Sequence, residues 1–309
     1  MKVGLLFPGQ GSQHVGMGRA LAEHFREARE AFEEADDTLG FGLSRLAWQG
    51  PIEVLTATEN AQPALYAHSL AVYRVLSRRI GPVCAAAGHS LGELSALGAA
   101  GTYRFRDGLL AVRRRGELMA RAGDRAPGSM AALLGLSVSD VEELCREAAE
   151  AGMVLVAANL NARGQVVVSG ERAAIEWVVR VARKKGAKRV VELAVSAAFH
   201  SPLMGPAAEE FRQYLQNIPF RRPAIPVVSN VTAEESYDPV AIKGLLVRQL
   251  TEPVRWIDCI ARMRVLGAER FAELGPGRVL TGLNRRNARG IPTSAFGTPE
   301  TVEAMENGR

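Results

Sequence analysis

The stretch Gly88-His89-Ser90-Leu91-Gly92 constrains the fold more than any other part of this 309-residue chain. The apolar run 82–87 before it is typical of a buried strand, and the Ala- and Leu-rich run 93–100 after it is typical of a helix. A G-x-S-x-G sequence between a strand and a helix is a nucleophile elbow, a strained turn that exposes the serine at a helix N-terminus. We therefore predict that Ser90 is a nucleophile. The alternative is an ordinary turn whose serine caps the helix.

The composition indicates a globular protein with a sizeable core. Hydrophobic residues make up 47% of the chain and charged residues 23%, and no apolar run is long enough to span a membrane. The first seven residues are too short for a signal peptide. Cys84, Cys145 and Cys259 are scattered and lie in no metal-binding spacing, which indicates a reducing compartment. We expect a cytoplasmic protein that binds neither a membrane nor a metal.

The net charge of +5 is mildly basic. No block of Lys and Arg is interleaved with aromatic residues, so we do not expect nucleic acid binding. A basic surface also suits an acidic protein partner or a polyanionic ligand. The run Arg183-Lys184-Lys185 with Lys188-Arg189 has two open interpretations, a solvated helix end or a docking surface for an acidic partner.

The middle of the chain has its own pattern of elements after Ala126-Pro127-Gly128. Apolar periodicity predicts strands at 130–136, 154–160, 165–169 and 187–195, with helices at 137–152 and 171–186 between them. We expect Ser137 or Ser139 to cap the first of these helices. The order strand, helix, strand, strand, helix, strand is that of a ferredoxin-like unit. We expect residues 127–196 to form a small subdomain inserted into a larger domain of residues 1–126 and 197–309.

The larger part is predicted to alternate strands and helices. The pattern predicts strands at 2–7, 82–87, 226–230, 270–274 and 293–296, and helices at 19–39, 61–80, 106–121, 202–216 and 239–250. Pro63 is expected in the first turn of its helix, where proline is tolerated. Residues 40–60 are interpreted as a turn-rich connection, and the polar tail from Pro299 as frayed.

Two further side chains, those of Arg115 and His200, have positions in the sequence that are typical of functional residues. Arg115 lies on the apolar stripe of its helix, with apolar residues three and four positions away on both sides. A buried guanidinium needs an anion, so Arg115 is either half of a core ion pair or a clamp for a substrate carboxylate. Of the five histidines, only His200, in a loop after a strand, is placed as a general base.

Taken together, the motifs resemble those of malonyl-CoA:acyl-carrier-protein transacylases, the acyltransferases that load malonyl groups for fatty acid synthesis. They follow the family order over nearly the whole chain. The matching stretches are Phe7-Pro8-Gly9-Gln10-Gly11-Ser12-Gln13, Gln62-Pro63-Ala64, Gly88-His89-Ser90-Leu91-Gly92-Glu93, Arg115-Gly116, Ser196-Ala197-Ala198-Phe199-His200-Ser201-Pro202-Leu203-Met204, Val227-Val228-Ser229-Asn230 and Gly275-Pro276-Gly277.

The resemblance implies an α/β fold, with a large α/β hydrolase-like domain built on a parallel sheet and an inserted ferredoxin-like subdomain. It implies a catalytic pair of Ser90 and His200, with a backbone carbonyl near Gln249 orienting the histidine. It also implies that the backbone N–H groups of Gln10 and Leu91 form the oxyanion hole. Arg115 would bind the free carboxylate of the malonyl group.

The reaction implied is a ping-pong transfer. Ser90 would take malonyl from malonyl-CoA as an ester and pass it to the phosphopantetheine thiol of an acidic acyl carrier protein, with no permanently bound cofactor. Two alternatives stay open. One is a serine hydrolase or thioesterase on the same elbow, for which Asp258 is a candidate third member by position. The other is a non-catalytic module that docks carrier proteins.

Overall fold

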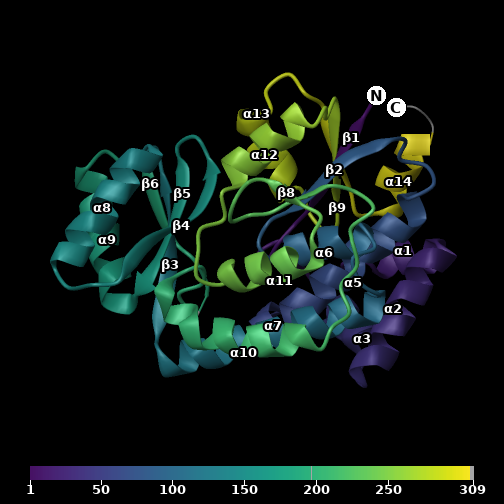
Figure 1. The fold of residues 1–309 in the computed structure, drawn as a ribbon, viewed down its shortest axis with the longest axis horizontal. Coiled ribbons are helices and arrows are strands. Elements are labelled where there is room, and N and C mark those ends of the chain that lie inside the picture. The colour runs from purple at the N-terminus through teal and green to yellow at the C-terminus, as the bar shows by residue number, and fades with distance from the viewer. Residues whose placement is uncertain (196, 307–309) are drawn as a thin grey trace.

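The computed structural model describes residues 1–195 and 197–306, and its strands form two sheets (Figure 1). The larger sheet has the strand order β10-β9-β1-β2-β7-β8. Its strand pairs are parallel, apart from the antiparallel pair of β7 and β8. The strands are β1 Val3–Phe7, β2 Val83–Gly88, β7 Val227–Val228, β8 Glu235–Ser236, β9 Arg270–Leu274 and β10 Thr293–Phe296.

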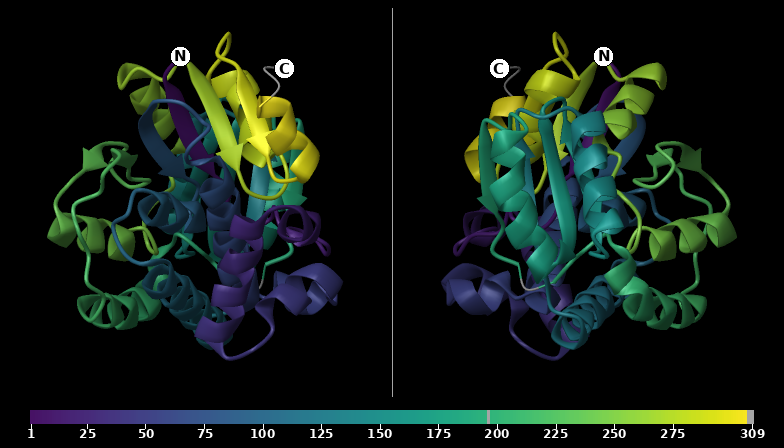
Figure 2. Two further views of the ribbon diagram at one scale, coloured as in Figure 1. Left: turned by 90° about the vertical axis from the view of Figure 1, so that its right-hand side faces the viewer. Right: turned by 90° about the vertical axis from the view of Figure 1, so that its left-hand side faces the viewer.

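Helices cover both faces of the larger sheet because its central strands are apolar on both sides. Leu5 and Phe7 of β1 join one core cluster, while Leu6 between them joins another. In Figure 2 the sheet is seen with helices packed on its two sides. Some of the helices pack on this sheet and others pack on those helices. The helices outside the smaller sheet's part of the chain are α1 Arg19–His24, α2 Arg26–Leu39, α3 Leu43–Gln49, α4 Ile52–Thr56, α5 Thr58–Leu76, α6 Leu91–Ala99, α7 Phe105–Arg125, the 3-10 turn Pro202–Met204, α10 Gly205–Gln216, α11 Pro239–Arg248, α12 Trp256–Val265, α13 Val279–Asn287 and α14 Pro299–Glu306.

The smaller sheet is antiparallel and has the order β4-β5-β3-β6. Its elements follow the expected order of strand, helix, strand, strand, helix, strand. Ser137 caps the first helix through a capping box with Asp140, as the sequence predicted. The helices α8 and α9 lie on the outer side of this sheet, at the left of Figure 1. The elements are β3 Gly128–Leu134, α8 Val138–Glu150, β4 Leu155–Ala162, β5 Gln165–Glu171, α9 Arg172–Lys184 and β6 Arg189–Glu192.

The two sheets are joined through β4 as well as through the chain. The segment before α12 runs beside β4, where the Val254 N–H donates to the Ala158 carbonyl at 2.8 Å. The Leu160 N–H donates in turn to the Val254 carbonyl at 2.9 Å. These backbone hydrogen bonds fix the smaller sheet against the larger one, so side chains from both can line one cavity.

Three predictions in the larger part were wrong, and one strand in each sheet is shorter than expected. The expected helix 19–39 is two helices, since Phe25 adopts an extended backbone with φ −113° and ψ 127°. The helical periodicity persists across this break because both pieces bury apolar residues in the same core cluster. Residues 40–60 contain the short helices α3 and α4, and the tail from Pro299 is the helix α14, held down by the fully buried Val302. The expected strands 226–230 and 187–195 are shortened to β7 and β6.

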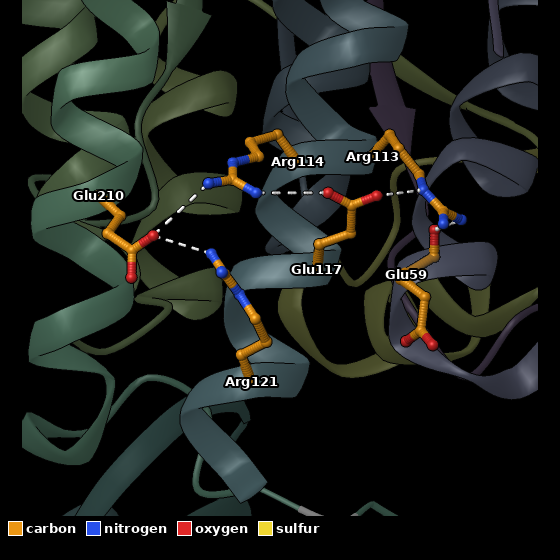
Figure 3. Close-up of polar contacts among 6 residues, drawn as sticks. All are labelled: Glu59, Arg113, Arg114, Glu117, Arg121 and Glu210. Atoms are coloured by element: carbon orange, nitrogen blue, oxygen red, sulfur yellow. Dashed lines mark hydrogen bonds and ion pairs between the residues drawn. The ribbon is translucent and has the colours of Figure 1, made fainter. Parts of the chain in front are cut away.

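Pro63 lies in the second turn of α5 and not in the first, because that helix begins at Thr58. A proline has no N–H, so the carbonyl four residues earlier, that of Glu59, loses its helical donor. Arg113 Nη1 of α7 donates to this carbonyl at 3.0 Å (Figure 3). The proline in the second turn therefore leaves a free carbonyl on α5, which accepts a hydrogen bond from α7.

Ion pairs also fix α7 against α10 (Figure 3). Arg121 of α7 lies 2.8 Å from Glu210 of α10, and Arg114 lies 3.5 Å from the same carboxylate. These groups are 33–46% exposed, so each pair adds little stability by itself. Their effect is on orientation, since α7 carries Arg115 and α10 follows the loop of His200. Within the described part of the chain, no helix combines the length and apolarity that crossing a membrane requires.

Candidate active site

The elbow predicted from the sequence is present at the end of β2. Ser90 has φ 53° and ψ −111°, a strained conformation for a residue with a side chain. A Cβ on Gly88 would lie 1.8 Å from the backbone of Gly92, and one on Gly92 would lie 2.1 Å from the Phe7 carbonyl oxygen. The Ser90 N–H donates to Asn230 Oδ1 at 2.7 Å, which holds the strained turn in place.

Ser90 and His200 come together across 110 residues of sequence. Ser90 Oγ lies 2.8 Å from His200 Nε2, and His200 Nδ1 lies 2.6 Å from the backbone carbonyl of Gln249. A carbonyl can only accept, so Nδ1 carries the proton and Nε2 accepts the hydroxyl proton of Ser90. Burial first, and then the charge of Arg115, lower the pKa of His200 to about 3. The imidazole is therefore neutral at neutral pH and able to take a proton from Ser90.

Arg115 is buried beside this pair with 1% of its surface exposed. Its Nη1 donates to Gln62 Oε1 at 2.8 Å, and its Nη2 donates to Gln249 Oε1 at 2.9 Å and to Ser90 Oγ at 3.2 Å. Its Nε has no hydrogen-bond partner within the described residues. Burial lowers the pKa of Arg115 to about 10, so the guanidinium is still charged at neutral pH.

The core ion pair considered for Arg115 is not formed, because its neighbours are two amides and a hydroxyl. No carboxylate of residues 1–195 or 197–306 lies within ion-pair distance of it. The site thus holds a desolvated positive charge next to a nucleophile, with no carboxylate in direct contact with it. Such a charge favours an anionic group on a ligand.

A cavity of about 330 Å³ opens in front of these side chains. Residues of both parts of the chain line it. Gln10 and Leu91 follow strands of the larger sheet, and Met130 and Asn159 come from β3 and β4 of the smaller sheet. Leu91 is the first residue of α6, so its N–H has no helical acceptor. Neither this N–H nor that of Gln10 has a hydrogen-bond partner among the described residues. A larger groove of about 790 Å³ lies between α10 and α11 and contains none of the predicted site residues.

Other candidates from the sequence lie elsewhere. Asp258 pairs with Arg255 at 2.9 Å and does not contact His200, whose Nδ1 is occupied by the Gln249 carbonyl. His89 points away from Ser90 and bonds Asn161 Oδ1 at 2.7 Å. Among the described residues, no group of three His, Cys, Asp or Glu side chains is placed to hold a metal.

Three polar neighbours of the site were not assigned a role from the sequence. These are Gln62, which bonds Arg115; Asn230, which bonds the Ser90 N–H; and Glu93, which bonds the Gln249 amide. All three fall within stretches that carry the resemblance, which was the only available signal. Their partners are 53, 140 and 156 residues away in the chain.

The sequence of this chain matches the protein-family model of the acyl transferase domain over residues 5–295. The chain belongs to the acyl transferase family. A malonyl CoA-acyl carrier protein transacylase from Bacillus subtilis is 42% identical to this acyl transferase over 302 residues, which cover 98% of this chain and 95% of that protein. The match therefore extends over both chains almost completely.

Solved structures of malonyl transferases also match this chain over nearly its whole length. An acyl-carrier-protein-S-malonyltransferase from Bartonella henselae is 46% identical, with a TM-score of 0.94 over 100% of this acyl transferase and 99% of that chain. A malonyl-transacylase solved in complex with a type II PKS acyl-carrier protein is 39% identical, with a TM-score of 0.96 over 100% of both chains. The mixed α/β architecture of a parallel and an antiparallel sheet is thus shared with structures of this family.

Proposed function

We propose that this acyl transferase moves a malonyl group from malonyl-CoA to the phosphopantetheine thiol of an acyl carrier protein, for fatty acid biosynthesis. The observation that carries the proposal is the buried, charged Arg115, with no carboxylate partner in the described structure and 3.2 Å from Ser90 Oγ. Malonyl differs from acetyl by a free carboxylate, and a planar guanidinium binds a carboxylate through two N–H groups. The relatives' names, all malonyl transferases, support the same assignment.

In the proposed first half-reaction Ser90 Oγ attacks the thioester carbonyl while His200 Nε2 takes its proton. The free N–H groups of Gln10 and Leu91 stabilise the oxyanion, and one such donor contributes about 3–4 kcal/mol. The C–S bond then breaks, the thiol of CoA leaves with the proton from His200, and a malonyl-serine ester is left. The carrier's thiol attacks this ester in the second half-reaction and returns the proton to Ser90 through His200.

The Gln249 carbonyl performs part of the work of the acid in a Ser-His-Asp triad. It fixes the tautomer and ring orientation of His200, as the 2.6 Å contact requires. As a neutral dipole it stabilises the imidazolium less than a carboxylate would. The proposed catalytic unit is therefore a dyad of Ser90 and His200 with a backbone orienting group.

We also assign the architecture in finer terms. The larger sheet and its helices, residues 1–126 and 197–309, form an α/β hydrolase-like domain. Residues 127–196 form a ferredoxin-like subdomain, for which the sheet order β4-β5-β3-β6 is the support. The boundary residue Ser196 lies outside the described residues. A cytoplasmic location and the absence of a permanently bound cofactor stay predictions from the sequence.

The proposed partner is an acidic carrier protein. One relative was solved in complex with an acyl-carrier protein. In this chain the basic run Arg183-Lys184-Lys185 with Lys188-Arg189 ends α9 and begins β6, on the smaller sheet that also lines the cavity. Complementary charge on the carrier would speed its association with this side of the molecule.

The rival function is hydrolysis of the same acyl-serine. The test compares the products formed from malonyl-CoA with and without a phosphopantetheinylated carrier protein. Transfer predicts malonyl carrier as the main product and little free malonate when the carrier is omitted. Release of malonate at an equal rate without carrier would indicate a thioesterase, and no turnover in either condition would contradict both.

A further inference from the structure

Glu93 is a buried carboxylate just behind the active site. It lies on α6, three residues after Ser90, with 3% of its surface exposed. Its Oε2 accepts hydrogen bonds from Gln249 Nε2 at 2.6 Å and from the Asn230 N–H at 3.0 Å. Within the described structure it has no ion-pair partner, and burial raises its pKa to about 7. A group this costly to bury needs a reason that packing does not supply.

The hydrogen bonds of the Gln249 amide point to that reason. The acceptors Glu93 Oε2, Ser90 O and Asn230 Oδ1 surround its Nε2 at 2.6, 3.1 and 3.3 Å. Its Oε1 faces the opposite way and accepts from Arg115 Nη2 at 2.9 Å. The Ser90 carbonyl can only accept hydrogen bonds, and so can Glu93 when it is ionised, so these acceptors hold the NH₂ end of the amide towards themselves and the oxygen towards Arg115. Glu93 is the nearest of the three acceptors and the only one of them that can carry a charge.

If the Gln249 side-chain amide were turned by about 180°, its N–H donors would face the N–H donors of Arg115. Its NH₂ group would then face the guanidinium of Arg115, which has no acceptor atom. Arg115 would lose one of the two amide oxygens that orient it, leaving Gln62 Oε1 at 2.8 Å and the Ser90 hydroxyl at 3.2 Å. The plane of its donors relative to Ser90 would no longer be fixed.

We propose that Glu93 is a positioning residue that sets the malonyl specificity of the site by fixing the amide of Gln249 and, through it, the guanidinium of Arg115. This inference rests on the proposed function, in which Arg115 binds the malonyl carboxylate. The interposed amide also has an electrostatic consequence. When Glu93 is ionised, its negative charge helps to keep Arg115 charged, yet it does not occupy the donors that the substrate carboxylate needs.

The test measures the rates at which malonyl-CoA and acetyl-CoA acylate Ser90 in Glu93→Gln. A glutamine at 93 is neutral and both donates and accepts, so it removes the charged and nearest of the three acceptors that orient the Gln249 amide. We expect the malonyl-to-acetyl ratio of kcat/KM to fall at least about tenfold, with the acetyl rate changing much less. Glu273→Gln is the matched control, because Glu273 is also fully buried and accepts backbone N–H groups of Leu280 and Thr281, away from Ser90.

A second variant shows whether Glu93 acts through Gln249. Gln249→Met keeps the backbone carbonyl used by His200 and removes the amide. We expect it to lower the malonyl-to-acetyl ratio as Glu93→Gln does, and the double variant to show no further loss. If Glu93→Gln does not fold, the result for Gln249→Met alone decides.

An unchanged malonyl-to-acetyl ratio in Glu93→Gln, or in Gln249→Met, would overturn the inference. The same holds for additive losses in the double variant, or for an equal loss in Glu273→Gln. These outcomes are separate from a failure of the proposed function. That failure would appear in the unmodified protein as the absence of any preference for malonyl.

Discussion

At the residue scale, we propose that Arg115 decides which acyl group the site accepts. Arg115→Ala removes the only charge in contact with Ser90 Oγ within the described residues, so the malonyl carboxylate would be buried without a partner. A charged, bidentate contact of about 3 kcal/mol corresponds to roughly a hundredfold loss in kcat/KM for malonyl-CoA. The acetyl-CoA rate is expected to change far less.

Arg114→Ala is the matched control for this measurement. Arg114 lies next in sequence on the same helix, but it is 33% exposed and contacts Glu117 and Glu210 at the surface. We expect its malonyl-to-acetyl ratio to equal that of the unmodified protein. If Arg115→Ala keeps the preference for malonyl, the guanidinium does not bind the substrate carboxylate.

The sequence identifies candidate residues where the signal is local. Ser90 stands in a contiguous motif, and Arg115 lies on a visible apolar stripe. Gln62 and Glu93 could not be assigned a role because their function comes from contacts with Arg115 and Gln249, 53 and 156 residues away. A polar side chain in a buried segment shows that a partner exists without showing which one.

At the scale of elements, the site depends on how closely β1, β2 and α6 approach each other. Gly92→Ala would place a Cβ 2.1 Å from the Phe7 carbonyl oxygen, and backbone atoms cannot yield as a flexible side chain can. We expect a loss of about 3 kcal/mol or more in the free energy of unfolding. Urea denaturation measures this loss.

Gly244→Ala is the companion variant for Gly92→Ala. Gly244 lies inside α11 with open space where its Cβ would be, so alanine should stabilise that helix by up to about 1 kcal/mol. Equal and small effects of the two substitutions would mean that the elbow is not as tightly packed as the structure indicates.

Helices and strands were predicted correctly where the apolar periodicity of a segment agrees with the turn residues that bound it. The strand–turn–helix at Ser90 and the alternating elements of residues 128–192 are examples. The break at Phe25 could not be foreseen, since the apolar periodicity runs through it and tertiary packing decides where the chain bends. The predicted position of Pro63 in its helix was wrong because Arg113, from another helix, donates to the carbonyl that the proline leaves without a donor. A rule based on local sequence does not include such a contact.

At the scale of the whole molecule, buried histidines make stability depend on pH. His68 is 1% exposed, with Nε2 3.1 Å from the Gly297 carbonyl, and burial lowers its pKa to about 4. The unfolded chain, with a His pKa of about 6.5, therefore binds more protons than the folded one below that pH. The stability contributed by His68 is fully present above pH 6.5 and is lost as the pH falls towards 4.

The measurement compares the unmodified protein with His68→Gln at pH 7 and pH 5. From pH 7 to pH 5 the unmodified protein should lose about 2 kcal/mol more in free energy of unfolding than the variant does. His200, also held neutral by burial, is present in both proteins and cancels in the difference. An identical pH dependence for the two proteins would show that His68 is protonated in the folded state.

The whole account depends on a covalent malonyl ester at Ser90, and intact-protein mass spectrometry tests this most directly. After brief mixing with malonyl-CoA the protein should gain one malonyl group, mapped to Ser90, and lose it when a phosphopantetheinylated carrier protein is added. Ser90→Ala should gain none. No adduct on the unmodified protein, or an adduct that persists in Ser90→Ala, would contradict the account.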